Sequence, residues 1–343
     1  MVDIEGVELS DEDRDLLTHP AVGGVILFTR NFESVDQLRA LVNAIHMVRA
    51  PALLIGIDQE GGRVQRLRGA FTPLPPISIF GDLYNNDENA ALDLARECAW
   101  LMAAELRAVG IDFSFAPVLD LRSEQSEVIN DRAFDSRPHV VSKLAHAYMA
   151  GMDAAGMAAV GKHFPGHGMV KGDSHHVLPR DGRDPQTISE NDLVPFKSAI
   201  RKGLRAIMMA HVVYPRCAPE PAGYSKHWIQ TVLRERLQFD GAVFSDDLTM
   251  AGAAGAGDFR ERAKRSLTCG CDMVLICNNR AGVIEVVSDL DHWNQALAQV
   301  RLMRLRGGAL GESFSDLRNS RRWRAINGRL REVFPDPQLD LQG

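Results

Sequence analysis

Short apolar runs alternate with longer amphipathic stretches along most of the chain. Seven runs stand out, at residues 24–28, 53–58, 113–120, 158–164, 206–212, 242–246 and 273–277, and each closes on a polar or glycine-rich junction. Runs of this length, bounded in this way, are typical of buried strands, although a buried helix segment gives the same local pattern. We expect seven strands, with residues 2–4 as a short eighth.

Helical patterns fill the intervals between the runs. Apolar residues recur every three or four positions in 35–50, 89–109, 139–155, 189–202, 228–237 and 258–268, and again in 283–300 and 315–333. Strands that alternate with helices form a mainly parallel sheet. Eight βα units close into a TIM barrel, whereas fewer make an open doubly wound sheet. We predict a single α/β domain, a (β/α)8 TIM barrel over residues 1–310, with a C-terminal helical extension and tail at 311–343 packed on it.

Composition narrows the functional classes. The 343 residues include 39 Lys and Arg against 45 Asp and Glu, and the formal charge of −6 argues against a nucleic-acid binder. Five cysteines without a disulfide or zinc-ribbon spacing fit a reducing compartment. The start of the chain is acidic, unlike a signal peptide, and there is no run of about 18 apolar residues to predict a membrane span. We therefore expect a cytoplasmic protein with no membrane partner, and the sequence leaves protein partners open.

Polar residues gather where the predicted strands end. If the runs are barrel strands, their C-terminal ends face one mouth, where such barrels hold their chemistry. The residues there are Asp58, Asp120, Lys162, His163, His211, Asp246 and Asp247. Gly61 and Gly62 turn the chain after Asp58, and Arg63 and Arg66 follow. A carboxylate beside guanidinium groups suits a polyhydroxylated ligand, and it equally suits a structural pair that braces the turn.

Histidines concentrate in one window. Four of the chain's 11 histidines lie within residues 162–176, at His163, His167, His175 and His176. A metal site is one interpretation, but Pro165 and Gly166 interrupt the helical spacing that a zinc-protease pair needs. Another is an acid–base loop, in which Asp173 accepts a ring N–H from His175 and raises the basicity of the other nitrogen. A solvated loop without function is the third.

Two adjacent carboxyl groups close the run at 242–246. Asp246 and Asp247 lie where a barrel strand would end. One of them can serve as a nucleophile or an electrostatic stabiliser, while the other caps the segment that follows. Their position in the sequence does not decide which is which.

These stretches together resemble the β-N-acetylhexosaminidases of glycoside hydrolase family 3, particularly the single-domain bacterial type. The resemblance rests on DQEGGRVQRL from Asp58, FSFAPVLD from Phe113, KHFPGHG with DSH from Lys162, and FSDDLTM from Phe244. The segment with Asp131, Arg132 and Phe134, the MMAH ending at His211, and GCDMVLICNNR from Gly270 extend it over nearly the whole barrel. Several long motifs in the same order are far more specific than any one of them.

The resemblance implies a retaining enzyme that removes terminal β-linked N-acetylglucosamine (GlcNAc) without a metal or organic cofactor. It assigns the nucleophile to Asp246 and the acid/base to His175, paired with Asp173, and it leaves His176 as a loop residue. Sugar contacts carry over to Asp58, Arg66, Arg132, Lys162 and His163. The implied substrates are imported cell-wall fragments, GlcNAc linked to anhydro-muramic acid, and the implied process is peptidoglycan recycling. The alternatives are a metal-dependent barrel hydrolase that uses the cluster from His163 to His176, and a non-catalytic sugar-binding barrel.

Overall fold

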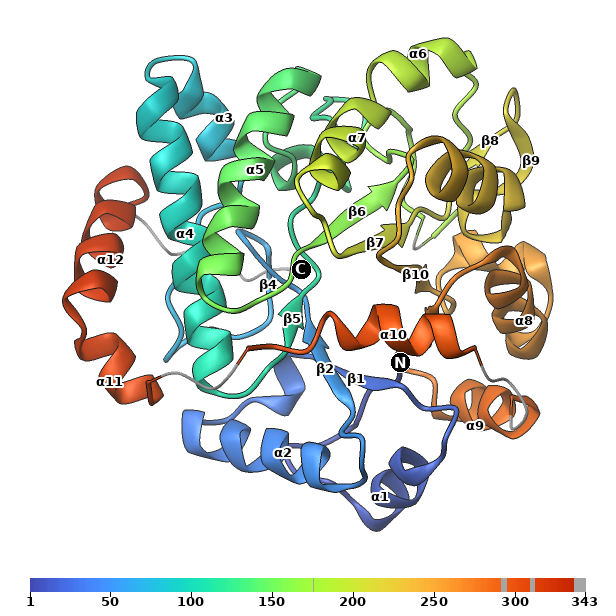
Figure 1. The fold of residues 1–343 in the computed structure, drawn as a ribbon, viewed down its shortest axis with the longest axis horizontal. Coiled ribbons are helices and arrows are strands. Elements are labelled where there is room, and N and C mark those ends of the chain that lie inside the picture. Colours follow the sequence, from blue (N-terminus) through green and yellow to red (C-terminus); the bar gives the residue numbers. More distant parts are fainter. Residues whose placement is uncertain (175, 291–294, 309–311, 336–343) are drawn as a thin grey trace.

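Parallel strands form two sheets at the centre of the molecule. The structure is a computed structural model, and it describes residues 1–174, 176–290, 295–308 and 312–335. One sheet has the order β1-β2-β5 and the other β11-β10-β7-β6, and helices surround them (Figure 1). The strands are β1 (Gly24–Leu27), β2 (Leu54–Ile57), β5 (Phe113–Ser114), β6 (Val160–Phe164), β7 (Ala206–Met209), β10 (Ala242–Asp247) and β11 (Met273–Leu275).

Single bridges join the two sheets on both sides. Val2 pairs in parallel with Val25 of β1 and with Ile276 just after β11, and Val118 pairs in parallel with Lys162 of β6. Each of the seven predicted runs contains one strand, so the predicted α/β fold with parallel strands is confirmed. The predicted eight-stranded barrel takes the form of two sheets that bridges connect, and the N-terminal run contributes one bridge rather than a strand.

Most of the helices follow the amphipathic stretches, but residues 11–18 and 78–84 form helices outside them, and the stretch 283–300 contains parts of two helices. The helices are α1 (Asp11–Thr18), α2 (Val35–Met47), α3 (Ser78–Tyr84), α4 (Glu88–Ala108), α5 (Pro138–Ala154), α6 (Pro185–Glu190), α7 (Leu193–Arg201), the π-helical η4 (His227–Arg236), α8 (Phe259–Cys269), α9 (Arg280–Asp289), α10 (Ala296–Met303), α11 (Phe314–Asn319) and α12 (Arg321–Val333). The stretch 189–202 divides into α6 and α7, and 315–333 divides at Ser320, whose side chain accepts a hydrogen bond from Trp323 N and caps α12.

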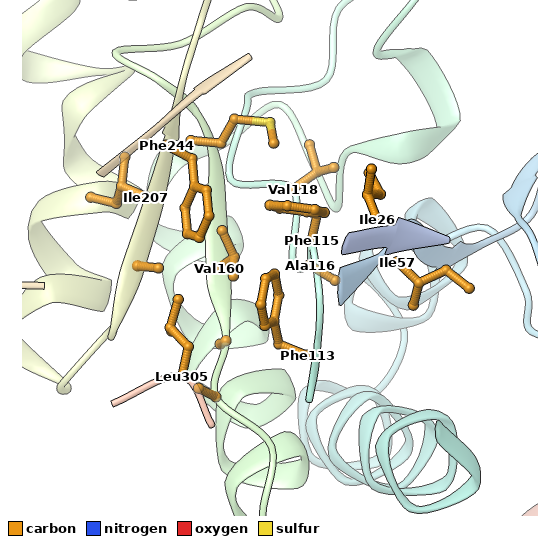
Figure 2. Close-up of a cluster of buried hydrophobic side chains, with 14 of the residues drawn as sticks. Ile26, Ile57, Phe113, Phe115, Ala116, Val118, Val160, Ile207, Phe244 and Leu305 are labelled. Carbon is orange, nitrogen blue, oxygen red and sulfur yellow. The ribbon is translucent and has the colours of Figure 1, made fainter. Parts of the chain in front are cut away.

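Aromatic rings fill the space between the two sheets. Phe113 and Phe115 lie with ring centroids 5.1 Å apart, and Phe244 of β10 lies 5.8 Å and 5.4 Å from them. Figure 2 shows these rings among apolar side chains from strands of both sheets, together with Leu305 from the segment after α10. The interior between the sheets is therefore packed and apolar, whereas polar residues gather at the carboxyl ends of the strands.

The C-terminal helices pack on the outside of α4. Trp323, Ile326 and Leu330 of α12 are buried, and Figure 1 shows α11 and α12 beside α4. The indole Nε1 of Trp323 donates a hydrogen bond of 2.9 Å to Glu105 of α4. The boundary predicted between residues 310 and 311 falls outside the described residues and stays a prediction.

Candidate active site

The carboxyl ends of the strands open into one pocket of about 1130 Å³. Seven of the eight site residues proposed from the sequence line it: Asp58, Arg66, Arg132, Lys162, His163, Asp173 and Asp246. The eighth, His175, lies outside the described residues. Glu60, Arg63, His167, Ser174 and Asp247 also line the pocket. Residues from β6, β10 and the segment that follows β2 meet here because parallel strands all end on the same side.

Two cations and two carboxylates form a buried network on one side of the pocket. Lys162 Nζ donates to Asp58 Oδ1 at 2.7 Å and lies 2.5 Å from Glu60 Oε1. Arg132 holds Glu60 in a bidentate pair, with Nε and Nη2 each 2.8 Å from a carboxylate oxygen. Arg66 Nη2 lies 3.9 Å from Asp58 Oδ2. Paired acceptors and donors of this kind are suited to binding several hydroxyl groups at once.

The charges in this network support one another. Burial would raise the pKa of Glu60, but the charges of Arg132 and Lys162 outweigh burial and hold that pKa below its ordinary value. Burial likewise opposes the charged form of Lys162, yet Asp58 and Glu60 keep its pKa above its ordinary value. Both groups therefore remain ionised at neutral pH, although the side chains of Glu60 and Lys162 are each only 3% exposed.

Asp120 holds two histidines at the end of β6. Its Oδ2 lies 2.7 Å from His163 Nδ1, and its Oδ1 accepts a hydrogen bond of 2.7 Å from the backbone N of His167. Burial would raise the pKa of Asp120, but these histidines lower it overall. A carboxylate on Nδ1 fixes the orientation of the His163 ring and leaves Nε2 for other contacts.

The two aspartates at the end of β10 differ in their surroundings. Asp247 Oδ1 accepts hydrogen bonds from Thr249 N at 3.0 Å and Cys277 N at 3.1 Å, and its Oδ2 accepts from Thr249 Oγ1 at 2.7 Å. Asp246 Oδ1 accepts from Asp247 N at 2.9 Å. The Asp247 carboxylate therefore caps the turn after β10 and links it to β11. His211, placed at the mouth by the sequence pattern, is buried beneath the turn with Nε2 3.1 Å from the Asp247 carbonyl oxygen.

The loop after β6 brings Asp173 to the pocket. His176 N and Val177 N both donate to the Asp173 carbonyl oxygen at 2.9 Å, so the chain turns immediately after Asp173. The side chain of His176 is 81% exposed, with Nε2 3.8 Å from Asp173 Oδ2, and it does not line the pocket.

Glu60 is the functional-site candidate that sequence reasoning missed. It lies two residues beyond Asp58, in the hairpin of β3 (Gln59–Gly61) and β4 (Val64–Gln65). A Cβ at Gly61, where φ is +112°, would lie 2.3 Å from the Pro75 carbonyl oxygen, so the turn requires glycine there. The available signal was the period of two in an extended segment, which directs Asp58 and Glu60 to the same side.

In the part of the chain that the structure describes, no group of three or more His, Cys, Asp or Glu side chains is arranged to hold a metal ion. Among the same residues, no helix has the length and apolar character needed to cross a bilayer.

Comparisons with known proteins agree with one another. The profile described as Glycosyl hydrolase family 3 N terminal domain matches residues 1–305. A Beta-hexosaminidase of Thioalkalivibrio sulfidiphilus is 51% identical over 341 residues, which cover 99% of this chain and 98% of that protein. A Beta-hexosaminidase of Alkalilimnicola ehrlichii is 50% identical over 342 residues, which cover 100% and 98%. The crystal structure of NagZ from Neisseria gonorrhoeae in complex with N-trifluoroacetyl-D-glucosamine has a TM-score of 0.92 and 40% identity, and covers 97% of each chain.

Proposed function

The chain belongs to glycosyl hydrolase family 3, and from that membership we propose that it is a retaining exo-β-N-acetylglucosaminidase. The observation that carries the proposal is the pocket itself. It places the strand-end carboxylate Asp246 and the loop carboxylate Asp173 in one space with the network of Asp58, Glu60, Arg132 and Lys162. A nucleophile, an acid–base group and a set of hydroxyl ligands are the parts that retaining glycoside hydrolysis needs.

In the proposed reaction, a carboxylate oxygen of Asp246 attacks the anomeric carbon of the terminal sugar. The bond from that carbon to the glycosidic oxygen breaks, and His175 as imidazolium gives the oxygen its proton. Neutral His175 then removes a proton from water, which attacks the same carbon and releases Asp246. Two displacements at one carbon retain its configuration.

The surroundings of the two strand-end aspartates support Asp246 as the nucleophile. Asp247 already accepts three hydrogen bonds, two from Thr249 and one from Cys277. Burial also raises the pKa of Asp247, which makes its carboxylate harder to form. A nucleophile must be ionised and able to turn toward the sugar, and Asp247 is committed to holding the turn.

The acid–base role goes to His175 because of its neighbours in the sequence. Asp173 and Ser174 line the pocket immediately before it, whereas His176 is exposed after it. An imidazole has an ordinary pKa of about 6.5, so it exchanges protons around neutral pH and does not need burial to shift that pKa. Asp173 would accept its ring N–H and aim the other nitrogen at the leaving oxygen.

Hydrolysis of a chromogenic N-acetyl-β-glucosaminide tests the proposal, with the matching β-glucoside as the test of acetamido selectivity. Asp246→Asn is expected to lower kcat by about 1000-fold or more, because no covalent intermediate can form. Asp247→Asn is the matched control, and it should keep measurable turnover at reduced stability. Full activity in Asp246→Asn would remove this residue as nucleophile. Activity is expected to survive a chelator because no step uses a metal.

The identity of the acid–base histidine needs a separate comparison. On substrates with poor leaving groups, His175→Ala should lose far more kcat/KM than His176→Ala, since protonation of the leaving oxygen matters most there. A larger loss in His176→Ala would reverse the assignment.

The natural substrates that we propose are cell-wall fragments with GlcNAc linked to anhydro-muramic acid, with or without peptide, in the cytoplasm. This part rests on the resemblance to the family. Turnover of such a fragment alongside a GlcNAc disaccharide tests it, and equal kcat/KM for both would contradict it.

A further inference from the structure

Ser174, between Asp173 and His175 in the sequence, is held from two sides. Its Oγ lies 3.0 Å from His167 Nε2, and its carbonyl oxygen accepts a hydrogen bond of 2.9 Å from Gly252 N. The exposed fraction of Ser174 is 2% and that of His167 is 1%. These contacts are therefore shielded from water, although the loop itself borders an open pocket.

His167 is itself anchored to the floor of the site. Its backbone N donates to Asp120, and the other oxygen of the same carboxylate meets the ring of His163. A sugar-contact histidine and the histidine that holds the loop therefore share one buried carboxylate. A shift of Asp120 would move both.

The ring of His167 has one hydrogen-bond partner in the described part of the chain. Burial lowers the pKa of His167, which favours the neutral form of its ring. Its Nδ1 makes no hydrogen bond to any described residue. The contact to Ser174 is thus the only hydrogen bond that the described residues offer this ring.

The second attachment reaches the segment that follows the proposed nucleophile. Gly252 lies in η5 (Ala251–Ala256), a few residues after Asp246. A Cβ at Gly252 would lie 2.9 Å from His211 Cβ and 3.1 Å from the Ser174 carbonyl oxygen. Glycine therefore allows the close approach of the two backbones, which connects the Asp173 loop to the chain beyond β10.

We propose that His167 and Ser174 form a clamp that sets the position of Asp173 relative to Asp246, and that His167 is a positioning residue for the acid–base step. The inference rests on the proposed function, because it assigns Asp173 to that step. His167 acts through the loop, by a hydrogen bond to the residue between Asp173 and His175. A catalytic group displaced by about 1 Å loses roughly 100-fold in rate, so a clamp of this kind is measurable in the kinetics.

The test compares leaving groups in His167→Ala and Ser174→Ala. For a methyl glycoside, whose leaving oxygen must be protonated, kcat/KM should fall by about 100-fold. For a dinitrophenyl glycoside, whose dinitrophenolate departs without a proton, kcat/KM should change by less than about threefold. Azide should raise kcat on the dinitrophenyl substrate. It attacks the anomeric carbon of the glycosyl-enzyme, the bond to Asp246 breaks, and a β-glycosyl azide forms without general-base help. His167→Gln should recover much of the loss because its Nε2 reaches Ser174.

A second His–Ser pair provides the matched control. His146 Nε2 lies 3.0 Å from Ser198 Oγ between α5 and α7, away from the pocket residues. Ser198→Ala removes the same kind of hydrogen bond and should leave the leaving-group dependence unchanged. Equal losses on both substrates, or weaker inhibition by GlcNAc, in Ser174→Ala would overturn the clamp. Failure of the proposed function is a different result, since the wild-type protein would then not cleave the dinitrophenyl substrate at all.

Discussion

Glu60 balances two buried cations at the pocket, and its removal tests that balance. Lys162 and Arg132 both pair with it, and the Glu60 and Lys162 side chains are each 3% exposed. Glu60→Gln removes the charge that the cations share, and we expect the free energy of unfolding at neutral pH to fall by about 3 kcal/mol. Inhibition by GlcNAc should also weaken, because the two cations lose the group that aims them. Denaturant unfolding and product inhibition measure these effects.

The same variant has a defined pH dependence. The pKa of Glu60 in the folded protein lies below its ordinary value of 4.5. Its ionisation therefore stabilises the fold at pH values above that ordinary pKa, and this stabilisation is lost as the pH falls toward the lowered pKa of the folded protein. The stability difference between wild type and Glu60→Gln should shrink in acid. Glu88→Gln, which breaks an exposed pair with Lys143, is the control: Lys143 lowers the pKa of Glu88 too, but water screens this pair, so the pH-dependent difference should be much smaller. A Glu60→Gln difference that does not vary with pH would contradict the argument.

Local sequence predicted polar residues that line the pocket, but it did not distinguish their individual roles. Asp58 and Lys162 could be placed because each lies at the carboxyl end of an apolar run, shortly before a break in the pattern. The proposed preference for Asp246 over Asp247 rests partly on the hydrogen bond from Cys277 N, which belongs to the segment after β11 and is remote in the chain. Glu60 was missed because its partner Arg132 lies in a different βα unit. The period of two places Glu60 on the same side as Asp58, but its ion pair with a distant segment cannot be predicted from spacing along the chain.

At the scale of elements, Arg183 holds together the segment between β6 and α7. It donates to Asp181 at 2.6–3.1 Å and to Asp192 at 2.8 Å and 2.9 Å, and the two carboxylates are 2% and 1% exposed. Arg183→Ala would leave both carboxylates buried without this cation. We expect a loss of about 3 kcal/mol in the free energy of unfolding. Because the same segment carries Asp173, kcat should also fall.

An exposed pair gives the comparison for Arg183. Arg96 and Asp93 lie on one face of α4, with side chains 55% and 52% exposed. Arg96→Gln should change stability by less than about 0.5 kcal/mol, since water already screens the pair. Thermal and denaturant unfolding of both variants measures the two losses in the free energy of unfolding, and equal losses would contradict the prediction.

The ion pair between Arg183 and Asp192 lies at a break between two helices that the sequence pattern did not predict. Apolar spacing continues through residues 189–202, and it predicts one helix there. In the structure Asp192 is buried between α6 and α7, where its carboxylate meets Arg183. A buried ion pair interrupts the helix without interrupting the period of apolar residues, so periodicity alone could not show the break.

At the scale of the whole molecule, local periodicity predicted the strands, whereas the way in which the two sheets connect depends on contacts between distant parts of the chain. Val2 pairs with Ile276 near the other end of the described core, and Val118 pairs with Lys162 between the two sheets. These are single bridges with almost no local signature. The apolar runs predict the strands, and their alternation with helices predicts that the strands are parallel. The packing of Phe113, Phe115 and Phe244 lies between the two sheets and helps to fix how they face each other.

One long-range contact adds to the apolar packing that attaches the C-terminal helices. Glu105 of α4 is 2% exposed, and it accepts hydrogen bonds from Thr72 N, Thr72 Oγ1 and Trp323 Nε1. Burial raises the pKa of Glu105 above its ordinary 4.5 despite these donors. A carboxyl with a raised folded pKa costs stability as the pH rises from the ordinary value through the folded one. Trp323 reduces that cost by favouring the ionised form.

Trp323→Phe removes this donor while keeping an aromatic ring at the contact between α12 and α4. At neutral pH we expect stability to fall by about 2 kcal/mol, because an ionised buried carboxylate loses one hydrogen bond. The folded pKa of Glu105 should rise further, so the gap between variant and wild type should widen from acidic to neutral pH. In a Glu105→Gln background no group ionises there, and Trp323→Phe should then have a cost that is independent of pH. Thermal unfolding of the four proteins across pH measures this, and a gap that narrows or stays constant toward neutral pH would contradict the argument that Trp323 stabilises the ionised form of Glu105.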